Sequence, residues 1–215
     1  MWIPLRGELQ LQIADLNRWI RPKEALATQH HGHTKAIGHA SGRWLALLGA
    51  ERAWGRLLGN PPTSGPKLLP ELYHPDRDLR REAVVLARAT TAPELESAVY
   101  AIADRLASLQ SPLYAAIARC PGRTYARRLQ VFLRLQRVRN FMSACCDREI
   151  DNDALARMAN YSPCHFLRTF NTVYQETPHA YLVDQRLQRA RRLLNTSDLA
   201  VTEIALASGF ENRSA

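Results

Sequence analysis

The chain has 215 residues, 46% of them hydrophobic and 23% charged, a composition typical of a folded protein with one large or two small domains. Its formal net charge is +9 at pH 7, which favours a polyanionic partner, first of all nucleic acid. No apolar run approaches membrane-span length and the first residues do not form a signal peptide, so a membrane-spanning or secreted protein is not expected.

The first 49 residues are predicted to form strands. In "ELQLQI" polar and apolar residues alternate strictly, which places Leu9, Leu11 and Ile13 on one face. Arg18–Ile20 and Arg43–Gly49 are two further strand candidates, separated by Pro and Gly residues. Because the chain begins almost within a strand, we expect an earlier partner strand to be missing.

From Ala50 the apolar residues recur at a helical period. "AERAWGRLLG" is predicted to be a helix that stops at Gly59, before a linker rich in Pro and Gly at Asn60–Pro70. "DRDLRREAVVLARA" and "APELESAVYAIADRLASL" are also predicted helices. The second has one apolar face, formed by Leu95, Val99, Ile102 and Leu106. This face packs within its own domain or against a second copy, and intrachain packing is the favoured alternative.

After a predicted hinge at Cys120–Arg123, nearly all of the chain is expected to be helical. A long helix is predicted for "ARRLQVFLRLQRVRNFMSACC", and four shorter helices follow at Asp151–Ala159, Ser162–Tyr174, Pro178–Asn195 and Val201–Ser208. Asp151 and Ser162 are the expected N-caps of the first two. Pro163 and Pro178 occupy natural first helical positions.

This last region is also the most basic. It holds fifteen arginines, no lysine and nine acids from Arg119 onward. Guanidinium groups suit phosphates and guanine edges, although an arginine-rich proteome would produce a similar surplus. The four cysteines have no CxxC pair and no metal-ligand spacing, and Cys145 and Cys146 are too close to pair easily. Reduced thiols in a cytoplasm are therefore expected.

A repeat with a spacing of 49 residues decides the interpretation. "LARMANYSPCHF" aligns with "IALASGFENRSA" when Ala156 is placed on Ala205. A small residue at this position lets two helices cross closely, as in the first helix of a helix-turn-helix.

Each copy continues with a turn residue that tolerates positive φ, Asn160 in the first copy and Gly209 in the second. An aromatic residue that can fill the space under the turn comes next, Tyr161 or Phe210. A single Ala-x-x-x-Gly would be weak evidence, but two copies in register indicate a double helix-turn-helix.

From about Arg127 onward the chain resembles the DNA-binding domain of the AraC/XylS family of bacterial transcription regulators. The resemblance covers "ALARMANYSPCHFLRTF", "ETPHAYLVDQRLQRARRLL" and "LAVTEIALASGFENRSA". "IPLRGELQLQI" is more weakly similar to a strand pair of the cupin-like sensor domain that many such regulators carry. The resemblance implies an α+β, mostly α protein. A sensor or dimerisation region is expected at 1–119, with partial cupin-like strands at 1–49 and helices at 50–119, and an all-α double helix-turn-helix domain at 120–215.

The bridging helix Pro178–Asn195 fits the spacing of DNA. At 1.5 Å per residue it is about 27 Å long, and successive major-groove segments on one face of DNA lie about 34 Å apart. One chain can therefore present two recognition helices to neighbouring turns. Sequence-specific DNA binding and transcription regulation, at the bacterial nucleoid within the cytoplasm, are the expected functions.

In the first recognition helix Phe166, Phe170 and Val173 are expected to face the core. The candidate DNA contacts are Ser162, Cys164, His165, Leu167, Arg168 and Asn171. Arg168 is the best candidate for a bidentate contact to guanine, with a phosphate contact as the alternative. Leu167 replaces a polar residue frequent in the family and is expected to meet a thymine methyl. His165 supports the turn or reaches a phosphate.

In the second unit the candidate contacts are Asn212, Arg213 and Ser214, with Arg213 the strongest. The first recognition helix ends at about Tyr174, and 49 residues later is position 223, so we expect the chain to stop within the second recognition helix.

Further expectations concern the flanking residues. Gln175 stands where the family usually has Gly, so it either adopts a left-handed conformation at a cost of about 1 kcal/mol or ends the helix differently.

Four arginines of the bridging helix either meet phosphate or form a solvated face: Arg186, Arg189, Arg191 and Arg192. The side chains expected to be buried are Tyr161, Phe166, Phe170, Leu187, Leu194 and Ile204.

Two rival functions remain. In "QHHGHTKAIGH" His31 and His33 could share a strand face and hold a metal as in cupin enzymes, but the usual further ligands are missing and Gly32 and Gly38 favour a polar loop. No metal site, cofactor or catalytic residue is therefore expected. The other rival is a dimerising interaction module that binds DNA poorly. The expected partner is double-stranded DNA; a small-molecule effector and a second copy of the chain stay open.

Overall fold

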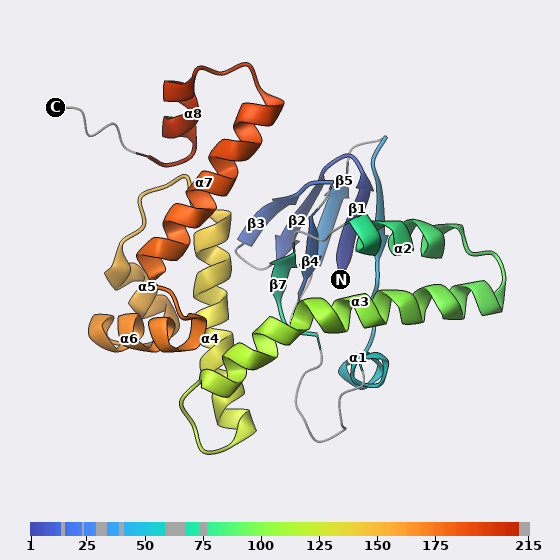
Figure 1. Cartoon of the computed structure of the whole chain (residues 1–215), viewed down its shortest axis with the longest axis horizontal. Helices are drawn as coiled ribbons and strands as arrows, with labels where there is room; N and C mark the ends of the chain where they lie inside the picture. Colours follow the sequence, from blue (N-terminus) through green and yellow to red (C-terminus); the bar gives the residue numbers. More distant parts are fainter. Residues whose placement is uncertain are drawn as a thin grey trace. The chain divides into compact units, whose positions relative to one another are not determined.

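The computed structural model describes residues 1–13, 16–22, 24–28, 34–38, 41–58, 68–73 and 77–210. The chain forms two compact units, Met1–Ala115 and Ala116–Ala215. The strands lie in the first unit, and the described part of the second is helical (Figure 1). The α+β, mostly α class is thereby confirmed. In the described ranges no helix is sufficiently long and apolar to cross a membrane.

The strands of the first unit form two antiparallel sheets. One has the order β6-β1-β4-β7, with the bounds Arg43–Ala46, Trp2–Arg6, Ala25–Ala27 and Glu71–Tyr73. The other has the order β3-β2-β5, with the bounds Leu16–Ile20, Leu9–Ile13 and Thr34–Gly38. In β2 the predicted alternation is confirmed for Leu9 and Leu11, which are fully buried, whereas the side chain of Ile13 lies outside the described part of the structure. They pack in one apolar cluster with Trp2, Ile20 and Leu26.

The prediction of a polar loop around the histidines is wrong in its second half. Thr34–Gly38 forms β5, which pairs along the whole of β2, from Thr34 opposite Ile13 to Gly38 opposite Leu9. Gly38 ends the strand and does not mark a loop within it. Of the histidines, His30, His31, His33 and His39 lie outside the described residues.

Two helices and most of a third complete the first unit: α1 (Glu51–Leu57), α2 (Arg77–Arg88) and α3 (Ala92–Arg119), whose last four residues belong to the second unit. α3 continues ten residues beyond the predicted segment and through Pro112. Its buried stripe continues too, with Ile102, Leu106, Leu113 and Ile117 each nearly inaccessible. That burial outweighs the loss of one helical hydrogen bond at proline. Leu95, predicted on the same face, is 50% exposed because it lies in the first turn of α3, where every residue is exposed.

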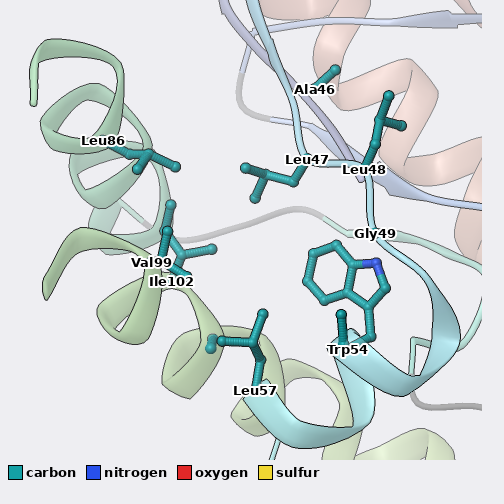
Figure 2. Close-up of a pocket in the computed structure, with 11 residues that line it drawn as sticks. Ala46, Leu47, Leu48, Gly49, Trp54, Leu57, Leu86, Val99 and Ile102 are labelled. Atoms are coloured by element: carbon teal, nitrogen blue, oxygen red, sulfur yellow. The ribbon is translucent and has the colours of Figure 1, made fainter. Parts of the chain in front are cut away.

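The described part of the first unit contains an apolar pocket of about 270 Å³. Its walls come from the end of β6 and from α1, α2 and α3; Figure 2 shows Trp54 and Leu57 of α1 opposite Val99 and Ile102 of α3. The indole nitrogen of Trp54 lies close to Gly49, where an added Cβ would meet it at 3.2 Å. The residues that line the pocket are alanine, leucine, valine, isoleucine, glycine and tryptophan, so its walls are mainly hydrocarbon.

The second unit is a bundle of α4 (Tyr125–Ala144), α5 (Asn152–Ala159), α6 (Pro163–Tyr174), α7 (Pro178–Thr196) and α8 (Val201–Ala207). α4 packs against α5 and α7, and α6 packs against α5 and α7. Its centre is a set of fully buried side chains from α4 and α6: Phe132, Leu135, Val138, Met142, Phe166, Phe170 and Val173.

The burial predicted for this unit is partly confirmed. Phe166, Phe170 and Ile204 are buried, and Tyr161 is half-buried. The prediction is wrong for Leu187 and Leu194, whose side chains are 54% and 57% exposed. At 100° per residue these two leucines point well away from the face of α7 that begins with Tyr181 and Leu182 and packs on α4 and α6.

Candidate nucleic-acid interface

The start of α6 is fixed by the turn that precedes it. Asn160 adopts the predicted left-handed conformation, with φ 56° and ψ 49°. The amide of Tyr161 donates to the carbonyl of Ala156 over 2.9 Å, the six-residue hydrogen bond of a Schellman turn. Asp151, as predicted, caps the preceding helix by accepting from the amides of Asp153 and Ala154. The first helix and turn are therefore built by local hydrogen bonds.

Ser162 occupies the N-cap position of α6, and Pro163 is the first helical residue. The predicted side-chain cap is wrong, because the Ser162 hydroxyl makes no capping hydrogen bond. Its side chain is exposed at the entrance of the helix. Proline at the first position supplies the helical φ and removes one of the amides that have no partner within the helix.

α6 has two opposite faces. Phe166, Thr169, Phe170 and Val173, spaced i, i+3, i+4 and i+7, are buried. The same spacing on the other side of the helix places together four exposed side chains, Cys164, Leu167, Arg168 and Asn171. We call these four the α6 stripe.

The α6 stripe combines four kinds of group. Arg168 provides a guanidinium fork, and Asn171 provides an amide with both donors and an acceptor. Leu167, directly before Arg168, is 39% exposed, so the stripe also presents an apolar side chain to water. The thiol of Cys164 is exposed at the N-terminal end. Such a helix face can meet base edges and thymine methyl groups in a major groove.

His165 lies beside the stripe. Its ring packs edge-on against Tyr161, with the ring centroids 4.6 Å apart. This contact links the first turn of α6 to the aromatic residue under the helix-helix turn, in agreement with the turn-supporting role expected for His165. The imidazole is nevertheless exposed.

The second turn reproduces the first. Gly209 has φ 88°, and its amide donates to Leu206, while the amide of Phe210 donates to Ala205 over 3.0 Å. These donors and acceptors are those of the first turn moved by 49 residues. The predicted repeat therefore extends to the backbone hydrogen bonds. Asn212, Arg213 and Ser214 lie outside the described residues.

The bridging helix differs from expectation in its arginines. Arg186 donates to the carbonyls of Cys146 and Arg148, and Arg189 donates to the carbonyl of Ala207. Both guanidinium groups are therefore hydrogen-bonded within the protein, and their contacts with phosphate stay a prediction. Arg191 is exposed.

The junction of α6 and α7 was incompletely predicted. Gln175 is left-handed, with φ 60°, so the first of its two alternatives is confirmed. Thr177 caps α7 by accepting from the amide of Ala180, which the pattern Thr-Pro at a helix start could have indicated. Arg139 of α4 lies between the rings of Tyr174 and Tyr181, 4.9 and 4.7 Å from their centroids. No sequence signal marks that cation–π sandwich, because Arg139 is 35 residues from Tyr174 and 42 residues from Tyr181.

Glu176 lies in the same junction, and partial burial raises the pKa of its carboxyl, against the opposing attraction of Arg139. Burial likewise raises the pKa of the Cys146 thiol and raises that of Cys120 to about 12. These two thiols are buried and protonated at neutral pH. Cys164 differs from them in being exposed. Among the described residues no cluster of His, Cys, Asp or Glu has the form of a metal site.

Comparison with known proteins relates the C-terminal region to known helix-turn-helix domains. Residues 155–215 match the family model described as a helix-turn-helix domain. The C-terminal region is an AraC-type helix-turn-helix domain. The chain is 39% identical over 75 residues to the HTH-type transcriptional regulator GlxA of Rhizobium meliloti (strain 1021), covering 33% of this chain and 22% of that protein.

A second regulator, the HTH-type transcriptional regulator ExsA of Pseudomonas aeruginosa, is 26% identical over 107 residues, covering 50% of this chain and 35% of that protein. The chain thus spans about a fifth to a third of the length of these relatives. A solved structure is also similar: the crystal structure of the DNA-binding domain of AdpA, the global transcriptional factor, in complex with a target DNA. This chain is 33% identical in sequence to it, with a TM-score of 0.35, and the match covers 36% of this chain and 70% of that one.

Within the AraC-type domain the family match begins at Leu155 of α5 and takes in both turns. α4, with the cation–π sandwich, lies before it in the sequence. The domain as folded is therefore larger than the matched segment, because α4 supplies Phe132, Leu135 and Val138 to its core.

Proposed function

We propose that the chain is a bacterial transcription regulator that binds double-stranded DNA sequence-specifically, with α6 in the major groove and the α6 stripe in contact with base edges. The observation that supports this most is the stripe itself. Four side chains able to distinguish bases are exposed on the face of α6 opposite Phe166 and Phe170, which anchor the helix in the core. The relatives are transcription regulators by name, which supports a non-enzymatic role. The cytoplasm, at the nucleoid, is where we propose that the protein acts.

Arg168 is the residue that we expect to read a guanine, by donating to O6 and N7 together. Asn171 follows one turn later on the same face, and Leu167 supplies apolar contact to a thymine methyl. We expect Ser162 and His165, at the N-terminal end of α6, to reach the flanking phosphates, together with the amides of the helix end. In the second copy Asn212, Arg213 and Ser214 would have the corresponding roles.

The test begins with selection of duplexes from a random library by the full chain at physiological salt. Affinities of Arg168→Ala and Arg168→Lys are then measured for the selected duplex and for random DNA. We expect the alanine variant to lose about 1–3 kcal/mol on the selected duplex and little on random DNA. Lysine should restore part of the affinity but not the preference for guanine, because it lacks the planar fork.

A matched control is Arg88→Ala, which removes the same charge from an exposed position of α2. It should leave the selectivity unchanged. Equal losses on selected and random DNA for Arg168→Ala would make Arg168 a phosphate contact. Failure of the chain to enrich any sequence would contradict the proposal and favour the interaction module.

A sensor role for the first unit is a second proposal, favoured by the pocket of about 270 Å³ (Figure 2). A small uncharged apolar molecule is the effector that its hydrocarbon walls would accept. Trp54 lies in the pocket wall and would report binding through its fluorescence. A chain whose Trp emission and melting temperature do not respond to a series of small aromatic and aliphatic compounds would contradict this proposal. Whether a second copy binds is testable by sedimentation.

A further inference from the structure

Two arginines of α7 connect parts of the AraC-type domain that are far apart in sequence. Arg186 donates from Nε to the carbonyl of Cys146 over 2.9 Å and from Nη2 to that of Arg148 over 3.0 Å. Both acceptors lie in the connection between α4 and α5, before the first helix-turn-helix copy. One guanidinium group therefore holds that connection against α7.

Arg189, one turn later, reaches the second copy. Its Nε donates to the carbonyl of Ala207, the last residue of α8, over 2.8 Å. Its Nη2 lies 3.3 Å from the carboxylate of Asp147, in the same α4–α5 connection. The two arginines, which we call the arginine clamp, thus join α8, α7 and the α4–α5 connection.

The second turn fits closely against the same place. A Cβ added to Gly209 would lie 2.5 Å from the carbonyl oxygen of Cys146 and 2.9 Å from Nε of Arg186. The turn after α8 is therefore in contact with the connection that leads into α5. Figure 1 shows α8 beside the C-terminal part of α7.

Apolar packing alone holds α8 weakly. In this seven-residue helix Ile204 is the buried apolar side chain, whereas Val201 and Leu206 are 73% and 57% exposed. The segment 197–200 that joins α7 to α8 is not helical. Hydrogen bonds from a cation to a backbone carbonyl are directional, so they define where α8 lies more strictly than one buried isoleucine does.

We propose that Arg186 and Arg189 are positioning residues that fix the separation of the two helix-turn-helix copies, and thereby set the spacing of the DNA segments that the protein selects. This inference rests on the proposed DNA binding for its consequence, whereas the positioning itself is independent of DNA.

The first experiment measures hydrogen exchange without DNA. Arg189→Met and Arg186→Met remove the donors and keep most of the side-chain stem, Arg189→Lys keeps one charged donor, and Arg191→Met is the control on the exposed face of α7. In Arg189→Met the amides of α8 should exchange roughly ten- to a hundredfold faster while those of α6 do not change. Arg189→Lys should restore part of the protection, and Arg191→Met should change nothing. Unchanged exchange in α8 for both methionine variants would overturn the positioning role.

The second experiment selects duplexes with the unaltered chain and with Arg189→Met or, if that variant does not fold, Arg189→Lys. The unaltered chain, whose second recognition helix is expected to be incomplete, should enrich a strong first sequence block and a weaker second block at one fixed separation. The variant should enrich the first block with the second lost or at scattered separations. The same two blocks at the same separation in the variant, or one block in the unaltered chain, would overturn the spacing role. If the unaltered chain selects no sequence, the proposed function fails, and the exchange experiment still decides the positioning.

Discussion

Gly209→Ala tests how closely the second turn is docked. Gly209 has φ 88°, and a left-handed conformation costs an L-residue about 1–2 kcal/mol. The added methyl would also lie 2.5 Å from the carbonyl oxygen of Cys146, closer than any ordinary contact. Relief requires the turn to move away together with the end of α8, which breaks the hydrogen bond from Arg189 to the carbonyl of Ala207, two residues before Gly209.

The loss of a hydrogen bond from a charged donor contributes about 1.5–3 kcal/mol. Together with the conformational term, Gly209→Ala should destabilise the second unit by about 2.5–5 kcal/mol, equivalent to a fall of roughly 10 °C or more in Tm for a domain of this size. Urea unfolding followed by circular dichroism at a helical wavelength measures the change, because the second unit is helical in its described part.

Asn160→Ala separates the two contributions. Asn160 occupies the same left-handed position in the first turn and is exposed, so alanine there meets the conformational cost without a clash. We expect a loss of about 1 kcal/mol. If Gly209→Ala costs no more than Asn160→Ala, the close docking of the second turn, and with it the reasoning from the Cβ distances, is refuted.

Three further predictions concern the first copy. Phe166→Ala should destabilise the second unit by about 3–5 kcal/mol in urea unfolding, because the ring is fully buried; a loss below 1 kcal/mol would contradict that burial. Because the pKa of Glu176 is raised in the folded protein, the free energy of unfolding should fall as pH rises from the usual carboxyl range through the raised pKa. Glu176→Gln should flatten this decline, and identical profiles of unfolding free energy against pH for the variant and the unaltered chain would contradict the prediction. Alkylation should modify the exposed Cys164 far faster than Cys146, and selected DNA should protect Cys164; equal rates with and without DNA would place α6 outside the groove.

The features that the sequence predicted correctly depend on a few neighbouring residues. The cap at Asp151 acts over three residues, and the turns at Asn160 and Gly209 over six, so a single stretch of sequence contains the whole interaction. The opposite faces of α6 follow from the helical period alone. This is why the stripe Cys164, Leu167, Arg168 and Asn171 could be identified before the structure, although its contacts with DNA stay a prediction.

Errors occur where the period of a helix is known but its partner is not. Leucine at 187 and 194 has the same seven-residue spacing as a core stripe, and the direction of the face depends on where α4 and α6 lie. The same holds for Thr34–Gly38, where glycine and a polar neighbourhood favoured a loop, but pairing with β2 provides hydrogen bonds for the whole segment. In both cases contacts between distant segments override the local preference.

The arginines of α7 show the largest gap between composition and structure. Basic residues on a helix next to a helix-turn-helix indicate phosphate contacts, and in sequence Arg186, Arg189 and Arg191 are equivalent. The fold makes them different, because two of them reach carbonyls that the ends of other elements leave without a helical partner: Ala207 at the end of α8, and Cys146 and Arg148 after α4. The positive charge of such a domain is therefore not a measure of its DNA contacts. Part of it completes the hydrogen bonding of helix ends, and removing that part should alter the spacing of the bound sites before it alters the affinity for any one of them.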